Sequence, residues 1–185
     1  MKRFLAPILL MVFLLPSLAL GLEMNDLVER EGLYYEKFTV VLFTGEVTGK
    51  IQGQFKDGKR EGLWTSFYEN GQLWWKGPYK DGKLNGPYVW YYDNGQLWSE
   101  ETYKDGEIED GPYLTYHENG QLWSEETYKD GKLNGPYVAY HDNGQLSSEG
   151  TYKDGKREGP WVTYWGNGTV VEEYTGTFKD GVKVE

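Results

Sequence analysis

The sequence predicts an all-β protein: an elongated antiparallel β-meander or solenoid of repeated β-hairpins, with about 24 residues per repeat. The tripeptide Lys-Asp-Gly recurs at steps of 24, 24, 25, 24 and 26 residues, and an Asn-Gly pair lies between successive copies. Periods of this length are typical of repeat arrays rather than of one globular core. The composition is 17% aromatic with 25 Gly and no Cys, which suits strands and turns and provides no disulfide framework. The tripeptides begin at Lys56, Lys80, Lys104, Lys129, Lys153 and Lys179.

Each repeat is expected to contain two strands, because it contains two turn signals. Asn-Gly and Asp-Gly are typical of two-residue hairpin turns, in which both residues need a positive φ. Counting outward from Asn70-Gly71 places Tyr68 opposite Leu73 and Ser66 opposite Trp75. Counting on through Asp81-Gly82 keeps Trp75 on the same face, opposite Tyr88.

Equivalent pairs in successive hairpins compensate in size: where one partner becomes larger, the other becomes smaller. Such compensation is expected of a packed surface. We call the face that carries them the first face. The pairs are Ser66 with Trp75, Trp90 with Ser99, Thr115 with Ser124, and Ala139 with Ser148.

Residues 1–21 are predicted to be a secretory signal peptide. A basic start at Lys2 and Arg3 precedes an apolar run, and Ala19-Leu20-Gly21 is a small-x-small cleavage site. The protein is therefore expected to be exported, to the periplasm or beyond; an uncleaved membrane anchor is the alternative. Cleavage would leave 17 Lys plus Arg against 29 acids, a formal net charge of −12.

The remaining chain divides into a cap, a repeat array and a tail. Residues 22–55 depart from the repeat and are predicted to form an N-terminal β cap, because terminal units must cover an apolar edge. Five hairpin repeats are expected over 56–178, followed by a C-terminal tail over 179–185. The third step, of 25 residues, contains one extra residue between Gly106 and Gly111, which is interpreted either as a β-bulge or as drift in loop length.

Composition and spacing argue against several function classes. A net charge of −10 disfavours nucleic acid and anionic membrane surfaces as partners. His117 and His141 occupy the same unit position as Tyr68 and Tyr92, two strands apart, which is roughly 9–10 Å and too far to share a zinc ion. Carboxylates such as Glu100 repeat with the unit, as on a solvated strand. We therefore predict no metal site, no cofactor and no enzymatic activity.

Aromatic residues on the second face of the predicted sheet are the candidate site. There the two-residue count aligns Phe67 with Trp74 and repeats that alignment in the next units, near the Asn-Gly end. The alternative is that a further layer buries this ladder as core; an exposed patch of this kind is usually a binding surface. The candidate partner-binding residues are Phe67, Trp74, Tyr91, Trp98, Tyr116, Trp123 and Tyr140.

The unit DGK-x-x-GPW/Y-x-x-YY/H-x-NGQL, at 81–97 and 130–146 and with variations at 154–168, resembles the bacterial MORN repeat variant. Proteins of the YwqK-type antitoxin group carry this repeat, and the segment GLYYEKFTVVLFTGEVTGK is similar to the lead segment of that group. The resemblance implies an elongated β-repeat platform used for protein or membrane-surface association.

These observations lead to three functional hypotheses. The first is an exported, non-enzymatic scaffold that binds another protein. The second is a glycan or cell-wall binding module, because aromatic ladders also suit sugar rings. The third is an antitoxin-like or immunity role, which the resemblance implies.

Overall fold

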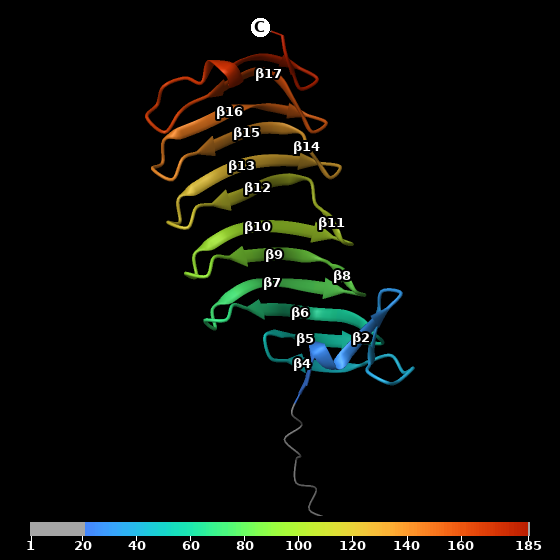
Figure 1. The fold of residues 1–185 in the computed structure, drawn as a ribbon. Helices are drawn as coiled ribbons and strands as arrows, with labels where there is room; N and C mark the ends of the chain where they lie inside the picture. Colours follow the sequence, from blue (N-terminus) through green and yellow to red (C-terminus); the bar gives the residue numbers. More distant parts are fainter. Residues whose placement is uncertain (1–20, 185) are drawn as a thin grey trace, which may run out of the picture.

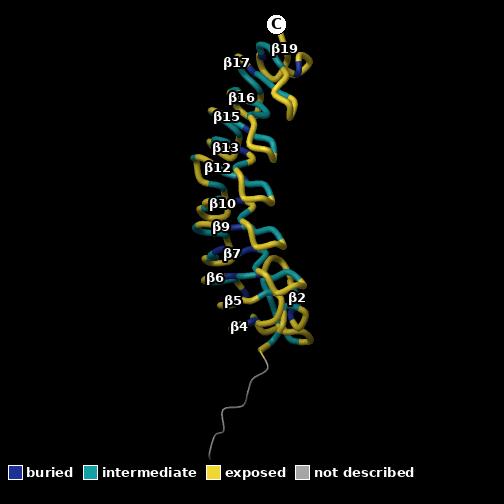
Figure 2. The backbone as a smooth tube through the Cα atoms, turned by 90° about the vertical axis from the view of Figure 1, so that its left-hand side faces the viewer, coloured by how far each residue is buried: buried dark blue, intermediate teal, exposed yellow. Residues whose placement is uncertain are grey.

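The computed structural model describes residues 21–184 and shows strands stacked one above another in a long column (Figure 1). Viewed after a 90° turn about the vertical axis, the column is narrow, and the buried segments of the backbone are short (Figure 2). The predicted all-β meander of repeated hairpins is confirmed. No helix within the described part of the chain is long and apolar enough to cross a membrane. The predicted signal peptide, residues 1–21, lies outside the described residues except for Gly21.

The N-terminal end of the column consists of short elements. The first strand, β1, runs parallel to β4, whereas β2 and β3 form a separate two-stranded antiparallel sheet. This small sheet is tied to the column because the Tyr34 N–H donates to the Gly58 carbonyl at 2.8 Å. The elements are β1 (Leu22–Glu23), the 3-10 turn η1 (Met24–Asp26), β2 (Leu27–Arg30), β3 (Leu33–Glu36) and β4 (Gly45–Thr48).

The repeat array follows as hairpins in which each strand pairs with its neighbours in the chain. Its strands are β5 (Ile51–Lys56), β6 (Lys59–Phe67), β7 (Leu73–Lys80), β8 (Lys83–Leu84), β9 (Gly86–Tyr91), β10 (Leu97–Lys104), β11 (Glu107–Ile108), β12 (Gly111–Tyr116), β13 (Leu122–Lys129), β14 (Lys132–Leu133), β15 (Gly135–Tyr140), β16 (Leu146–Lys153) and β17 (Lys156–Thr163). The C-terminal elements are the 3-10 turn η2 (Glu172–Tyr174), β18 (Gly176–Lys179) and β19 (Val182–Lys183).

The Asp-Gly turns are two-residue hairpin turns, as predicted. Asp81 has a φ of 51° and Gly82 of 85°, and Lys80 pairs with Lys83 across the turn. Asp is one of the few residues besides Gly that tolerate this left-handed conformation. The same positive φ recurs at Asp57, Asp105, Asp130, Asp154 and Asp180.

The Asn-Gly turns differ from the prediction. Gly71 has a φ of 84°, but Asn70 does not have a positive φ. Instead the Tyr68 N–H donates to the Gln72 carbonyl at 2.8 Å, which closes a three-residue loop, and the Asn70 side-chain oxygen accepts from the Gln72 N–H at 3.0 Å. Leu73 therefore pairs with Phe67, and the predicted pairing of Leu73 with Tyr68 is wrong.

A β-bulge then restores the predicted register. Phe67 pairs with Leu73 and Ser66 pairs with Trp75, so Trp74 has no partner and the strand carries one extra residue. The longer loop and the bulge cancel, and the first-face pairs beyond them are as predicted. The bulge residue is Trp98, Trp123 or Ser147 in the next hairpins.

A second irregularity follows each Asp-Gly turn. Tyr79 pairs with Leu84 as expected, but Trp75 pairs with Trp90 rather than with Tyr88, so the returning strand carries two extra residues. Two residues leave the faces unchanged, because side chains alternate with period two. After Gly106 the excess is three residues, and the additional one lies between β11 and β12. It is absorbed there, because Thr115 still pairs with Ser99, as Trp90 pairs with Trp75 one unit earlier.

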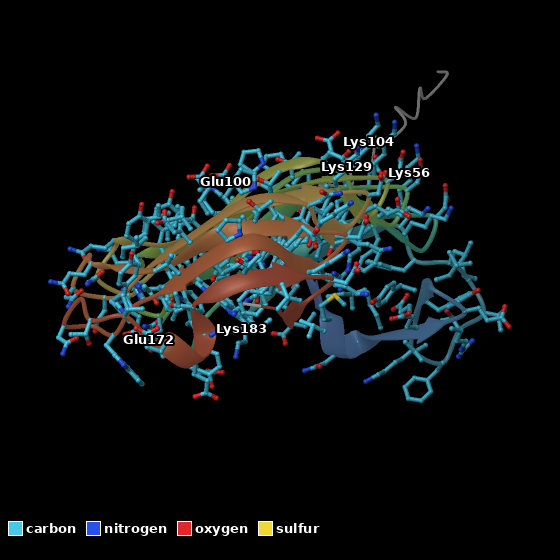
Figure 3. All side chains as sticks on the ribbon, turned by 90° about the horizontal axis from the view of Figure 1, so that it is seen from above. Lys56, Glu100, Lys104, Lys129, Glu172 and Lys183 are labelled. Atoms are coloured by element: carbon cyan, nitrogen blue, oxygen red, sulfur yellow. The ribbon has the colours of Figure 1, made fainter. Side chains whose placement is uncertain are left out.

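Seen from above, the sheet is an arch, with Glu100, Lys104 and Lys129 on its convex side (Figure 3). The first face is the concave side. At the N-terminal end it packs Leu27 and Val47 around Phe55 and Trp64, and this core continues through Trp75 to Tyr88. At the other end Trp161 and Phe178 are buried. The centre of the concave face therefore lies between two separate cores.

Candidate functional site

One side-chain position next to each Asn-Gly turn links successive hairpins. The Tyr68 hydroxyl donates to the Tyr91 carbonyl at 2.8 Å, and the Tyr92 hydroxyl to the Tyr116 carbonyl at 2.9 Å. In the next two units His117 and His141 take this position, and each Nε2 lies 2.9 Å from the corresponding carbonyl of the following unit. Because a carbonyl can only accept, Nε2 carries the proton. The expected equivalence of these histidines with the tyrosines is confirmed.

The turn asparagines add a second link at this edge. The Asn70 amide donates to the Asp93 carbonyl at 2.7 Å, and the Asn94 amide to the Glu118 carbonyl at 3.0 Å. Asn119 and Asn143 make the equivalent bonds further along. Each turn is thus held to the next by two hydrogen bonds, so side chains that project from this edge keep a fixed spacing.

The β-bulges turn the tryptophans toward the concave face. The Trp98 ring lies 5.8 Å from the ring of Trp90 and 6.0 Å from that of Tyr92, both first-face residues. Trp74 likewise lies 5.7 Å from Trp90 and 5.8 Å from Tyr68. The expectation that the tryptophans lie on the second face is therefore wrong, because a bulge adds one residue and reverses the alternation locally.

We call this concave group the aromatic platform. Its rings are close enough for aromatic contacts, which favour tilted and edge-to-face arrangements such as those seen here. Trp123 extends it by one unit and lies 5.8 Å from His117. The platform consists of Tyr68, Trp74, Trp90, Tyr92, Trp98, His117 and Trp123.

The other four predicted site residues lie on the convex face. Tyr91 pairs with Leu97 there, and the Lys76 ammonium lies 5.8 Å from the Tyr91 ring centre. Phe67, Tyr116 and Tyr140 make the equivalent pairs with Leu73, Leu122 and Leu146. The sheet thus separates the seven predicted residues into four convex and three concave ones, and their role in partner binding stays a prediction.

The platform is exposed at Trp98 and Trp123, whereas its members Trp74 and Trp90 are half-buried and pack against the N-terminal core. Trp98 is 37% exposed and Trp123 is 46% exposed, whereas the core rings Trp64 and Trp161 are 0% and 1% exposed. A hollow between successive turns is lined by Tyr92, His117, Glu118, Asn119, Trp123 and Asp142. The platform can therefore be reached by a ligand from the concave side.

One carboxylate per unit borders the platform at the turns. The only ion pair within residues 21–184 joins Lys50 to Glu69, the acid of the first turn. Burial raises the pKa of Tyr92, and the Glu118 carboxylate adds to this shift. Burial and then Asp93 raise the pKa of Tyr68 in the same way. These acids therefore act electrostatically on the tyrosines of the platform.

Four segments of the chain match the MORN repeat variant family, at residues 60–81, 84–105, 109–130 and 133–154. This chain belongs to the MORN repeat variant family. Among curated proteins none matches it. Solved structures that it resembles include one described as "Crystal structure of GtfA/B complex bound to UDP and GlcNAc", at 12% identity with a TM-score of 0.23. That match covers 82% of this chain and 26% of the other, so the chain spans about a quarter of its length.

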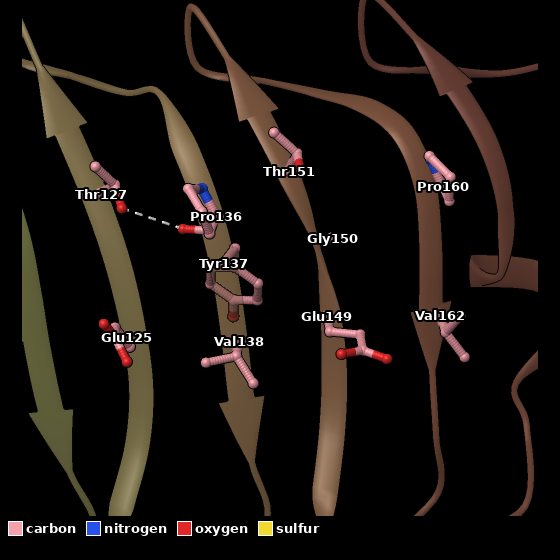
Figure 4. Close-up of a pocket in the computed structure, with 10 residues that line it drawn as sticks. All are labelled: Glu125, Thr127, Pro136, Tyr137, Val138, Glu149, Gly150, Thr151, Pro160 and Val162. Atoms are coloured by element: carbon pink, nitrogen blue, oxygen red, sulfur yellow. Dashed lines mark hydrogen bonds between the residues drawn. The ribbon is translucent and has the colours of Figure 1, made fainter.

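The convex face of the MORN repeats offers an alternative site. Side chains from β13, β15, β16 and β17 line a hollow there (Figure 4). Its Val and Pro side chains alternate with Glu125, Glu149 and Thr127, and the Thr127 hydroxyl is bonded to the Pro136 carbonyl at 3.4 Å. No aromatic ring of the platform reaches this hollow, and its apolar strip is interrupted by charge in every unit.

The groups that the platform presents are aromatic faces, hydrogen-bonded turns and carboxylates. No group of three His, Asp or Glu side chains in the described chain could hold a metal ion. Sequence reasoning missed Tyr68, Trp90, Tyr92 and His117 as platform members. The signal that could have found Tyr68, Tyr92 and His117 is the recurrence of an aromatic side chain next to the Asn-Gly turn, where a bulge brings the neighbouring tryptophan onto their face. Trp90 has no such recurrence, because Thr115 holds its position in the next unit.

Proposed function

We propose that this MORN repeat protein is an exported, non-enzymatic scaffold that binds another protein. The observation that supports this best is the aromatic platform: partly exposed rings beside Asn-Gly turns that are hydrogen-bonded to one another. Tryptophan and tyrosine are enriched among the residues that dominate protein interfaces. MORN repeats are consistent with a repeat protein that binds proteins or membranes, and the family is generally non-enzymatic.

A glycan or cell-wall ligand is the second candidate, because a sugar ring also stacks on an indole. The unpaired carboxylates beside the platform favour a protein, since a neutral glycan gains nothing from a row of like charges. An antitoxin-like or immunity role would be one form of protein binding, in which the partner is a toxin.

Binding to the platform is tested with the immobilised protein and two extracts of the cell envelope, one of soluble proteins and one of insoluble wall. We expect wild type to retain one protein reproducibly and the variant W98S/W123S to lose it. The convex-face variant Y91S/Y116S is the matched control and should retain it. Retention of wall material instead, or equal retention by both variants, would contradict the proposal.

Export is tested separately by intact mass of the protein from the envelope fraction. A mature N-terminus near Leu22 is expected, because Ala19-Leu20-Gly21 is the predicted cleavage site. A protein that still begins at Met1 would refute export by cleavage.

A further inference from the structure

We infer that the platform binds a polyproline II segment of its partner, with a Lys or Arg at every third residue. This inference rests on the proposed function, because it assumes that the partner is a protein. Three features of the concave face carry it: the spacing of the units, the arrangement of the rings, and the row of carboxylates.

The spacing of the units selects the backbone of the ligand. Successive Asn-Gly turns are two strands apart, which is about 9.5 Å. A polyproline II helix has three residues per turn and rises about 9.3 Å in that turn, so every third side chain returns to the same side at the repeat of the sheet. In an extended strand, side chains on the same side are about 6.7 Å apart. In an α-helix, a side chain returns to the same side after seven residues, which is about 10.5 Å. Neither spacing matches that of the units, so the side chains of such a ligand would lose register with successive units.

The rings provide the surface that such a helix needs. Aromatic-lined grooves recognise polyproline II segments because these are preformed and lose little entropy on binding. Trp74, Trp90 and Trp98 form a continuous wall, with ring centres 5.7 and 5.8 Å apart. In the next unit Thr115 takes the place of Trp90, and a hollow opens between Tyr92 and Trp123. Proline rings fit against such walls and into such hollows.

The carboxylates select the residue at every third position. Asp93, Glu118 and Asp142 each occupy the turn position just before the turn asparagine, so they recur with the unit. All three are exposed, and none forms an ion pair within residues 21–184. A cationic side chain that points to this edge would meet one carboxylate per unit and could lie over an exposed indole face, where cations are attracted. A basic segment is thus complementary in both charge and period.

The occupant must add to the concave surface rather than to the sheet. The platform lies within the array, where each longer strand is already paired on both sides: β6, β7, β9, β10, β12, β13, β15 and β16. Insertion of a further strand is therefore blocked at the platform, and side-chain contacts have to provide the affinity.

The test measures binding of synthetic peptides to the purified protein by calorimetry at low ionic strength. Repeated Lys-Pro-Pro triplets should bind, and repeated Glu-Pro-Pro triplets should not. A peptide of the same composition with its lysines grouped together should bind at least about tenfold more weakly, which corresponds to about 1.4 kcal/mol. Added salt should weaken the Lys-Pro-Pro complex, because the charges are exposed.

Two pairs of variants locate the binding. D93N/E118Q and W98S/W123S should each weaken the Lys-Pro-Pro peptide at least about tenfold. The matched controls are D105N/E107Q, which removes acids at the opposite edge, and the convex Y91S/Y116S; neither should change the affinity. Equal affinity for the grouped and the regular peptide, or an unchanged affinity in W98S/W123S, would overturn the inference.

The outcome for the peptide and the outcome for the proposed function can be told apart. If no triplet peptide binds but the envelope protein is still lost in W98S/W123S, the inference fails and the scaffold function stands. If wall oligosaccharides bind at Trp98 and Trp123 and no protein is captured, both fail.

Discussion

Trp64 near the N-terminal end and Trp161 near the C-terminal end occupy the unit position that Tyr113 and Tyr137 hold in the centre. At the ends the indole lies flat over a glycine of the preceding strand: a Cβ built on Gly150 would lie 2.3 Å from the Trp161 ring. An arginine covers the other side, with the Arg157 guanidinium carbon 4.4 Å from the ring centre. Gly53, Arg60 and Trp64 repeat this arrangement at the N-terminal end.

The central units replace both partners of the aromatic residue. The pairings of Glu100 with Leu114 and of Glu125 with Val138 place Glu101 opposite Tyr113 and Glu126 opposite Tyr137. The position of Arg157 is taken by Ile108 or Leu133. Identical backbone units thus form a closed apolar core at the ends and a concave face with carboxylates in the centre. The difference indicates that the end units stabilise the column, and we propose that the central units bind the partner.

The largest expected effect on stability is at the glycine beneath the end-core tryptophan, and it distinguishes the end units from the central units. Gly150→Ala should lower the free energy of unfolding by about 3 kcal/mol, because its Cβ cannot coexist with the Trp161 ring. The equivalent central change, Glu126→Ala, should alter it by less than about 1 kcal/mol, because a side chain is already accommodated there. Denaturant unfolding measures both. Equal costs would show that end and centre do not differ in packing.

The turns should not distinguish the regions. Gly95 in the centre has a φ of 84° and Gly168 near the C-terminal end a φ of 82°. Replacing either by Val should cost about 2 kcal/mol, because a β-branched residue is strained at positive φ. The melting temperatures of both variants should therefore be lower than that of wild type by a similar amount. An unchanged melting temperature for Gly95→Val would contradict the positive φ at this turn.

Within the platform, the two exposed tryptophans should differ in cost. Trp123→Ser is expected to lower stability by about 1 kcal/mol, as a surface substitution does, because its ring contact is with His117 alone. Trp98→Ser should cost more, because that ring contacts both Trp90 and Tyr92. The natural Ser147 at the same position of the next hairpin is consistent with a modest effect. A loss as large as that of Gly150→Ala would mean that the platform is core.

The smallest effect concerns pH. Burial raises the pKa of Glu126 above its usual value, so the folded state holds this proton more tightly than the unfolded state. Its contribution to stability is therefore complete at low pH and is lost as the pH rises from about 4.5 through the folded pKa. Glu126→Gln should match wild type at pH 4 and be slightly more stable at pH 7, as measured by thermal unfolding. If Glu126→Gln is less stable than wild type at pH 7, the predicted direction of the Glu126 effect is wrong.

The hairpins and their faces could be predicted because Asp-Gly and Asn-Gly mark the turns and small residues face large ones. The pairs of Ser66 with Trp75 and of Trp90 with Ser99 were predicted in this way. The bulges could not be predicted. A two-residue loop without a bulge and a three-residue loop with one give the same pairing beyond Ser66 and Trp75, so the pattern of side chains does not distinguish them. The curvature of the sheet, and with it the concave platform, depends on these bulges.

The most direct test of the account is an NMR titration that follows the indole N–H signals of the eight tryptophans as the Lys-Pro-Pro peptide is added. The signals of Trp98 and Trp123 should shift in a saturable way, with a smaller shift at Trp74, which completes the wall beside Trp90. Those of Trp64 and Trp161 should stay in place, because both rings are enclosed by the cores at the two ends. Shifts at Trp64 or Trp161 without shifts at Trp98 and Trp123 would contradict the division of the column into end cores and a central binding face.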